Sequence, residues 1–311
     1  MTIEAAPVST RRPAKAPRSH GGQIVPLLTI IAALIVIWYL AAIIMNASLA
    51  RMAAENSGRT LTTVELAGAS WSLERPILPA PHQVAREMWA TIALVDPTSR
   101  RSLVYHAWVT ISATLLGFAI GALFGVALAA LIVHMRALNK SLMPWIIASQ
   151  TVPILAIAPI IIVVLGSRGI TGLLPKSIIS AYLCFFPVTI GMVKGLTSPD
   201  RMQLDLMRSY SASTSQIFWK LRLPSAMPFL FASLKVAIAI ALTGAIVGEL
   251  PTGAQAGIGA RLLAGSYYGQ TLQIWAALFV AAALAAAGVA LIGLIERATR
   301  SAMGVKPDAA S

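Results

Sequence analysis

Residues that could do acid–base or metal chemistry are few in this chain and widely separated. The histidines are His20, His82, His106 and His134, and the single cysteine is Cys184. No two histidines have the spacing of a HExxH or HxxxH metal motif, and one cysteine can form neither a disulfide nor a cysteine-based metal site within a chain. Since no nucleophile stands beside a base either, we expect no catalytic residue, no metal and no cofactor. Cys184 is then a small buried apolar side chain.

Two charged residues stand out because apolar sequence surrounds them. Lys235 lies inside an apolar segment, near one end, so that it either snorkels to the membrane surface or has a gating role in a cavity. Glu249 ends the same segment. We expect a structural or docking role for it, as a solvated interfacial carboxylate, as a partner of Arg261, or as a contact for another protein.

Apolar composition determines the elements that must position these residues. The chain has 57% hydrophobic and 11% charged residues, with a mean hydropathy of +0.78, which is too apolar for an ordinary soluble domain. Six windows have about the length that crosses a bilayer: 24–45, 107–133, 141–165, 177–193, 225–248 and 271–295. Continuous apolar runs of this length predict an all-α membrane protein with six transmembrane helices, not a barrel.

The distribution of Lys and Arg predicts that both termini are cytoplasmic. Fourteen basic residues would then lie inside: Arg11, Arg12, Lys15, Arg18, Arg136, Lys140, Lys194, Arg201, Arg208, Lys220, Arg222, Arg297, Arg300 and Lys306. The short outer loops hold Arg168, Lys176 and Arg261, and Lys176 marks a snorkelling helix end. The net charge of +13 therefore indicates topology, and no basic groove for nucleic acid is evident.

This topology divides the chain into five parts. Residues 1–22 form a disordered basic cytoplasmic arm, 24–45 the first span, 46–106 an outer loop, 107–295 the core and 296–311 a cytoplasmic tail. The first span is longer than a signal-peptide core, although small residues after it leave cleavage open. In the outer loop, 46–75 shows no periodicity. The segment after Pro76 predicts an interfacial helix with one apolar face, formed by Val84, Met88, Trp89 and Ile92.

Glycines and prolines inside the spans indicate packing and bending. Gly117, Gly121 and Gly125 form a small-residue face suited to close helix packing, within the subunit or across a dimer. Pro153 and Pro159 lie in the third predicted span and Pro187 in the fourth. Each proline frees a carbonyl, so these residues either line a translocation pathway or only distort the packing.

The segment 205–224 is polar and structured between two apolar segments. Ser198 followed by Pro199 predicts a helix start, and Ser213 with Gln216 predicts a capping box for a second helix. We expect Pro224 to end that second helix. A capped cytoplasmic hairpin between two spans suggests a docking surface, within a coupling loop at 195–224.

This segment resembles the cytoplasmic loop of membrane subunits of ATP-binding-cassette (ABC) importers, whose pattern is Glu-Ala-Ala, three residues, Gly, nine residues, Ile-x-Leu-Pro. Asp205, Leu206 and Met207 align with Glu-Ala-Ala, and Leu223-Pro224 with Leu-Pro. Ser211 replaces the Gly, which argues against a turn with positive φ there. The matched or adjacent loop residues are Asp205, Leu206, Met207, Ser211, Phe218, Trp219, Leu221, Leu223 and Pro224.

Further motifs between about 78 and 295 are similar to the nitrate/sulfonate/taurine branch of these importers. They are Pro153, Ala156, Pro159, Gly166, Lys176, Phe185-Phe186-Pro187, Gly195-Leu196, Glu249 and Gly257-Ile258-Gly259. The resemblance implies a binding-protein-dependent type I permease fold in the bacterial inner membrane. Its implied substrates are riboflavin, a pyrimidine-type compound, a sulfonate, taurine or nitrate.

The resemblance also implies partners: a cytoplasmic ABC ATPase dimer, an extracytoplasmic solute-binding protein, a second permease copy or paralogue, and membrane lipid. The chain has no G-x-x-x-x-G-K-[ST] loop, so ATP and Mg²⁺ would bind the ATPase. Asp205 would cap the first loop helix or pair with a basic group. Phe218, Trp219 and Leu221 would anchor the ATPase or pack on their own subunit.

Two other functions remain open from the residues alone. An ion-gradient-driven secondary transporter usually carries charged residues in mid-membrane, and the spans here are nearly uncharged. An intramembrane enzyme would need the catalytic cluster that this sequence lacks.

Overall fold

The structure, a computed structural model, describes residues 21–251 and 255–304. Every regular element in these ranges is a helix, which confirms the predicted all-α class. Most of the predicted N-terminal arm and the end of the predicted tail, 305–311, lie outside the described residues. The chain divides into two compact units, one through Leu73 and the other from Glu74.

The first unit contains α1 (Gly21–Asn56) and α2 (Thr63–Ser72). With 36 residues, α1 is about 54 Å long, so it extends well beyond a membrane span. The segment 46–75, which shows no periodicity in the sequence, is largely helical: α1 continues through Asn56 and α2 follows. Thr62 and Glu65 form a capping box that starts α2.

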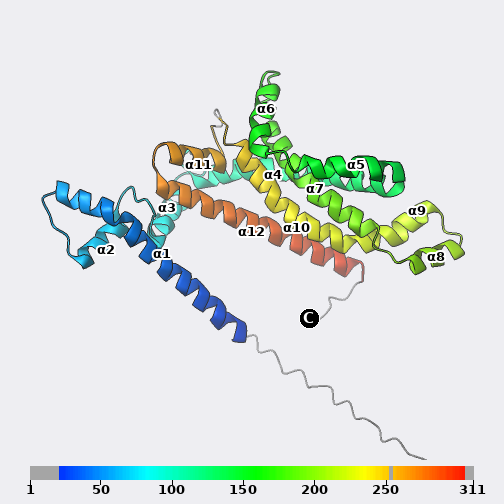
Figure 1. The fold of residues 1–311 in the computed structure, drawn as a ribbon, viewed down its shortest axis with the longest axis horizontal. Coiled ribbons are helices and arrows are strands. Elements are labelled where there is room, and N and C mark those ends of the chain that lie inside the picture. Colours follow the sequence, from blue (N-terminus) through cyan, green and yellow to red (C-terminus); the bar gives the residue numbers. More distant parts are fainter. Residues whose placement is uncertain (1–20, 252–254, 305–311) are drawn as a thin grey trace, which may run out of the picture. The chain divides into compact units, whose positions relative to one another are not determined.

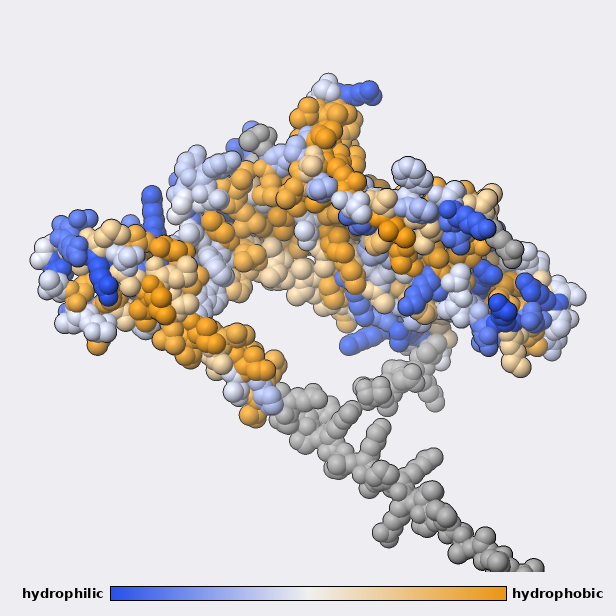
Figure 2. Space-filling view, viewed as in Figure 1, coloured by the Kyte–Doolittle hydropathy of each residue, from blue (hydrophilic) through white to orange (hydrophobic). Residues whose placement is uncertain are grey.

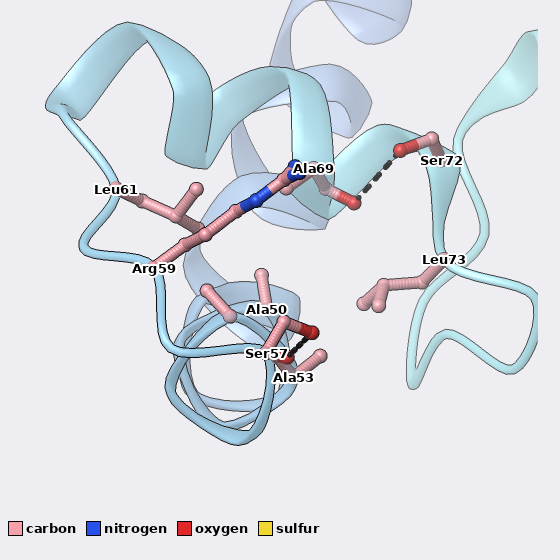
Figure 3. Close-up of a pocket in the computed structure, with 9 residues that line it drawn as sticks. Ala50, Ala53, Ser57, Arg59, Leu61, Ala69, Ser72 and Leu73 are labelled. Atoms are coloured by element: carbon pink, nitrogen blue, oxygen red, sulfur yellow. Dashed lines mark hydrogen bonds between the residues drawn. The ribbon is translucent and has the colours of Figure 1, made fainter.

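Polar contacts hold α2 against α1. The Trp71 indole N–H donates to the Tyr39 carbonyl at 3.2 Å, and the Asn46 amide donates to the Ser70 carbonyl at 3.2 Å. The rings of Tyr39 and Trp71 meet edge to face at 5.3 Å. A pocket of about 480 Å³ is lined by residues of α1, of α2 and of the connection between them. Most of its side chains are small, and Arg59 extends toward Ala69 (Figure 3).

The second unit begins with α3 (Pro81–Ala93) and is built on four long helices. These are α4 (Leu103–His134), α7 (Leu173–Leu196), α10 (Leu223–Gly248) and α12 (Thr271–Ala302). α7 packs between α4 and α10, and α12 packs along α10 (Figure 1). Short helices lie at the two ends: α11 (Ile258–Tyr267) at one, and α8 (Arg201–Ser209) with α9 (Thr214–Ile217) at the other.

The third predicted span, 141–165, is divided between two helices in the structure. Five helices of the described residues are long and apolar enough to cross a membrane, and a sixth crossing requires joining α5 (Arg136–Ser149) to α6 (Ile154–Gly166), which meet at 95°. Pro153 caps α6 at this break. A proline disfavours helix in the residue before it, so the span predicted over 141–165 is not one continuous helix and breaks at Pro153. Pro159 lies within α6 and Pro187 within α7.

Glycines on α4 allow its close approach to α7. A Cβ at Gly117 would lie 2.5 Å from the Ser177 carbonyl oxygen, and one at Gly125 would lie 2.8 Å from that of Phe185. At Gly121, it would overlap the Cys184 sulfur. Both helices can therefore touch backbone to backbone only with glycine here. The small-residue face packs within the subunit.

The predicted interfacial helix is present as α3, and only part of its apolar face is buried. Val84 is buried, and Met88 packs against the core around Leu103. Trp89 and Ile92 are exposed, because α3 lies on α12 and α4 with only one side.

Candidate functional site

The polar segment between α7 and α10 folds as a helical hairpin, residues 201–222, which we call the polar hairpin. Its first helix, α8, is capped by Asp200, whose carboxylate accepts from the Arg201 N–H at 2.7 Å. The predicted cap at Ser198 was wrong. The Ser198 hydroxyl instead donates to the Gly195 carbonyl at 2.7 Å, so it belongs to the end of α7.

The turn of the polar hairpin contains Ser211 with a φ of 54°. Its N–H donates to the Arg208 carbonyl, and the Ala212 N–H donates to the Met207 carbonyl, which is the Schellman arrangement of a helix end. We expected no left-handed turn because Ser stands where the family pattern has Gly. That expectation was wrong: the backbone keeps the glycine conformation despite the strain on Ser.

The second arm of the polar hairpin continues without a break into a span. The predicted capping box of Ser213 and Gln216 is confirmed. A π-turn, η1 (Phe218–Arg222), then leads directly into α10. Pro224 therefore does not end the helix. In a regular α-helix, the Pro224 ring would clash with the carbonyl four residues earlier. Here the residues before Pro224 form the wider π-turn instead of a regular α-helical turn. Thr214 to Gly248 is one continuous helical rod.

Four large side chains are exposed on the polar hairpin, Met202, Leu206 and Tyr210 on successive turns of its first arm and Trp219 on its second arm, and we call them the apolar stripe. The exposed fractions of these residues are 80%, 58%, 80% and 63%. Figure 2 shows hydrophilic residues gathered at the α8–α9 end of the second unit. The stripe is thus exposed apolar surface on an otherwise polar segment, which is a feature of protein interaction sites.

Other predicted loop residues are placed differently. Phe218 packs on the core around Met192 and Leu196, and its ring lies 5.0 Å from that of His134. Asp205 does not cap α8; it pairs with Arg208 at 3.0 Å on the exposed side of the helix. The remaining members, Met207, Leu221, Leu223 and Pro224, are half-buried.

At the α11 end, a buried polar network joins four helices around Glu249. This carboxylate is fully buried and lies 2.9 Å from the Thr110 hydroxyl. It accepts from the Gly259 N–H at 2.9 Å and lies 3.6 Å from the Lys176 ammonium. Burial raises the pKa of Glu249, and the Lys176 charge and the Gly259 N–H oppose that rise.

The network corrects two expectations. Glu249 is neither solvated nor paired with Arg261, whose guanidinium lies 3.5 Å from the Arg101 carbonyl. Lys176 does not snorkel: its side chain is 11% exposed, and its ammonium donates to the Ala256 carbonyl at 2.9 Å. The structure thus places both charges inside the protein.

His106 and Thr110, one turn apart on α4, complete the network, and the sequence analysis missed both. The Gly257 N–H donates to His106 Nδ1 at 3.0 Å, and Nε2 lies 2.9 Å from the Arg100 carbonyl. These partners assign the proton to Nε2. The Ile258 N–H donates to Thr110 at 2.8 Å. Gly257 has a φ of 124° and no room for a Cβ beside Glu249, so the glycine is required.

Lys235 has a partner that neither sequence interpretation included. Its ammonium lies 2.5 Å from Glu296 on α12, and Arg300 lies 2.6 Å from the same carboxylate. This triad ties α10 to α12 near the α8–α9 end. Glu296 was assigned to the tail because the apolar window ended at Ile295, whereas α12 continues to Ala302.

The described residues contain no group of three or more His, Cys, Asp or Glu side chains that could hold a metal ion. The two polar clusters join helices to one another, and the polar hairpin exposes large apolar side chains.

Comparisons with known proteins agree with this arrangement. The family of binding-protein-dependent transport system inner membrane components matches residues 117–302. The riboflavin transport system permease protein RibX of Chloroflexus aurantiacus is 32% identical over 221 residues, which are 71% of this chain and 78% of that protein. The formylaminopyrimidine transport permease protein ThiX of Halalkalibacterium halodurans is 27% identical over 228 residues, 73% and 88% of the two chains.

A probable ABC transporter permease protein of Haemophilus influenzae is 30% identical over 204 residues, 66% of this chain and 78% of that protein. These relatives favour the importer interpretation over an ion-gradient-driven transporter. The matched region holds the polar hairpin, the triad and much of the buried network. The chain is a multi-pass inner-membrane permease, and it belongs to the family of binding-protein-dependent transport system inner membrane components of ABC importers.

Proposed function

We propose that the polar hairpin is the surface on which a separate cytoplasmic ATPase drives this permease. The observation that carries the proposal is the stripe of Met202, Leu206, Tyr210 and Trp219, exposed on a hairpin that continues directly into a span. The excess of Lys and Arg in 194–222 supports a cytoplasmic position for it. ATP and Mg²⁺ bind the ATPase, since this chain has no phosphate-binding loop.

The continuous rod from Thr214 to Gly248 supports a mechanical role for this surface. A push on Trp219 moves α10 as a rigid body, and the Lys235–Glu296 pair carries α12 with it. At the far end, the network around Glu249 holds α10 to α4, α7 and α11. Closure of an ATPase dimer then reorients the helices between two states.

The remaining parts of the importer are a second permease copy or paralogue, membrane lipid and an extracytoplasmic binding protein. Such a protein delivers the solute at the α11 end. The names of RibX and ThiX favour a heterocyclic solute, riboflavin or a pyrimidine, over a sulfonate, taurine or nitrate.

A pull-down from membranes in mild detergent tests the docking surface. Tagged wild type should co-purify an ABC ATPase, and the Leu206→Asp, Trp219→Asp double variant should lose it, because two charges enter an apolar contact. Tyr268→Asp is the matched control: an aromatic residue 71% exposed, at the α11 end. Equal ATPase recovery from the double variant would refute the surface. Uptake by wild type that needs an ion gradient but no ATP would favour the secondary transporter.

A further inference from the structure

A cavity of about 750 Å³ opens at the α11 end of the second unit. Its walls come from α4, from the end of α6, from the segment that leads into α7 and the start of α7, from the end of α10, and from Pro251, Gln255 and Ala256 after α10. Its volume is within the range of about 300–1,000 Å³ that small-molecule sites usually have. In the proposed topology, this is the side on which a binding protein releases its solute.

One face of α4 forms the aromatic wall of the cavity. Tyr105, Trp108, Val109 and Ser112 follow the spacing i, i+3, i+4, i+7 and all border it. Trp108 is 71% exposed, so the face of its indole is open to a ligand. A planar ring could stack there with a gain beyond the burial of apolar area.

The charges around the cavity select against an anion. Among the described residues that line it, Lys176 is the charged one. Its ammonium is already bound to the Ala256 carbonyl and faces the Glu249 carboxylate at 3.6 Å. An anion entering the cavity would lose water without gaining a free counter-charge, which is costly. A neutral solute avoids that cost, and the hydroxyls of Ser112 and Thr171 offer it hydrogen bonds.

We propose that this cavity binds the transported solute inside the permease, and that the solute class is a neutral, planar, aromatic heterocycle stacked on Trp108. The proposal rests on the proposed importer function and adds a substrate-contacting site in the membrane subunit itself. Tyr105 and Trp108 supply the apolar contact, and Ser112 and Thr171 supply polar contacts.

Gly166, the last residue of α6, provides a test that leaves the aromatic wall intact. It lines the cavity, and a Cβ added to it would meet no atom within 4 Å. Gly166→Leu should therefore fill part of the cavity without disturbing the fold. Gly68→Leu is the matched control, because Gly68 lies in α2 of the first unit, does not line the cavity, and its Cβ would also meet nothing.

Binding should be measured on the purified full-length chain in lipid nanodiscs. Riboflavin serves as a large and cytosine as a small planar heterocycle, and taurine, a zwitterion without an aromatic ring, serves as the competitor. We expect at least one heterocycle to saturate. Trp108→Ala and Gly166→Leu should each weaken it about tenfold, as loss of stacking and burial implies. Gly68→Leu should bind as wild type does, and taurine should not compete.

Three results would overturn the proposal: neither heterocycle saturates, Gly166→Leu binds as wild type does, or taurine displaces the bound probe. A Trp108→Ala variant that binds as wild type does would likewise refute the stacking contact and identify Trp108 as a membrane-interface anchor. Recovery of the ATPase with the same preparations separates the two proposals. A chain that recruits the ATPase but shows any of these three results refutes the solute site alone, whereas a chain without an ATPase refutes the importer mechanism.

Discussion

Glu249 and Lys176 form an ion pair inside the protein, with 3.6 Å between Oε1 and Nζ, although 73 positions separate them in the chain. The pair joins the end of α10 to the start of α7. The same carboxylate accepts hydrogen bonds from the Thr110 hydroxyl on α4 and from the Gly259 N–H in the first turn of α11. Four helices thus share one buried anion.

Removing one partner of this pair should cost more than removing both. Glu249→Gln leaves the Lys176 ammonium without its counter-ion, and we expect a loss of about 2–4 kcal/mol. Adding Lys176→Met should recover part of that loss. Thermal unfolding of Glu249→Gln, Lys176→Met and the double variant in one detergent measures the three losses of stability. If the two single losses simply add in the double variant, the two side chains are not coupled.

Phe218 and Trp219 are neighbours that should respond differently to truncation. Phe218→Ala removes a ring packed on Met192 and Leu196 and should lower stability by about 2 kcal/mol, less than for a fully buried ring. Trp219→Ala removes an exposed ring and should leave the melting temperature nearly unchanged while ATP-driven uptake falls. Melting curves and uptake assays separate the two effects; a stable Phe218→Ala variant would contradict the packing role.

Ser211→Gly should stabilise the polar hairpin. Ser211 has a φ of 54°, where a side chain is strained and glycine is not, so we expect a gain of about 0.5–1 kcal/mol. Ser209→Gly, within α8, is the control and should destabilise instead. The melting temperatures of both variants decide the matter: a loss of stability in Ser211→Gly would mean that the turn does not need a left-handed residue.

Gly117→Val should destabilise the α4–α7 contact strongly. Its Cβ would lie 2.5 Å from the Ser177 carbonyl oxygen, and separating two packed helices costs about 1–3 kcal/mol or more. Gly68→Val is the control: it makes the same change in helix propensity, but its Cβ would meet no other atom. Folded yield and melting temperature should fall only for Gly117→Val, and equal behaviour would place the small-residue face elsewhere.

The triad of Lys235, Glu296 and Arg300 should matter for coupling between α10 and α12. Glu296→Gln leaves two cations near each other without an anion, so we expect a loss of about 1–2 kcal/mol and reduced uptake with unchanged ATPase recovery. Lys235→Met should be milder, because Arg300 keeps its partner at 2.6 Å. If Glu296→Gln transports as well as wild type, the triad has no role in coupling.

Features that depend on neighbouring residues could be predicted from the sequence alone. Long apolar runs predicted the spans because every backbone group in a bilayer needs an internal hydrogen bond. The box of Ser213 and Gln216 was predicted because both groups lie within one turn. The polar segment around Trp219 was recognised by its composition and by the pattern that ends at Pro224, and its coupling role stays a prediction.

Only the tertiary structure decided which distant groups meet. Pro224 was expected to end a helix, and the π-turn before it allowed the rod to continue. Glu249 was expected in water, beside Arg261 or against another protein, but its partners Thr110 and Lys176 come from other helices, and no local pattern encodes that meeting. A buried charge is stable only where such partners converge, and convergence is a property of helix packing. The sequence therefore determined the apolar spans and the place of the polar hairpin, and the packing of α4, α7 and α10 decided the partners of the buried charges.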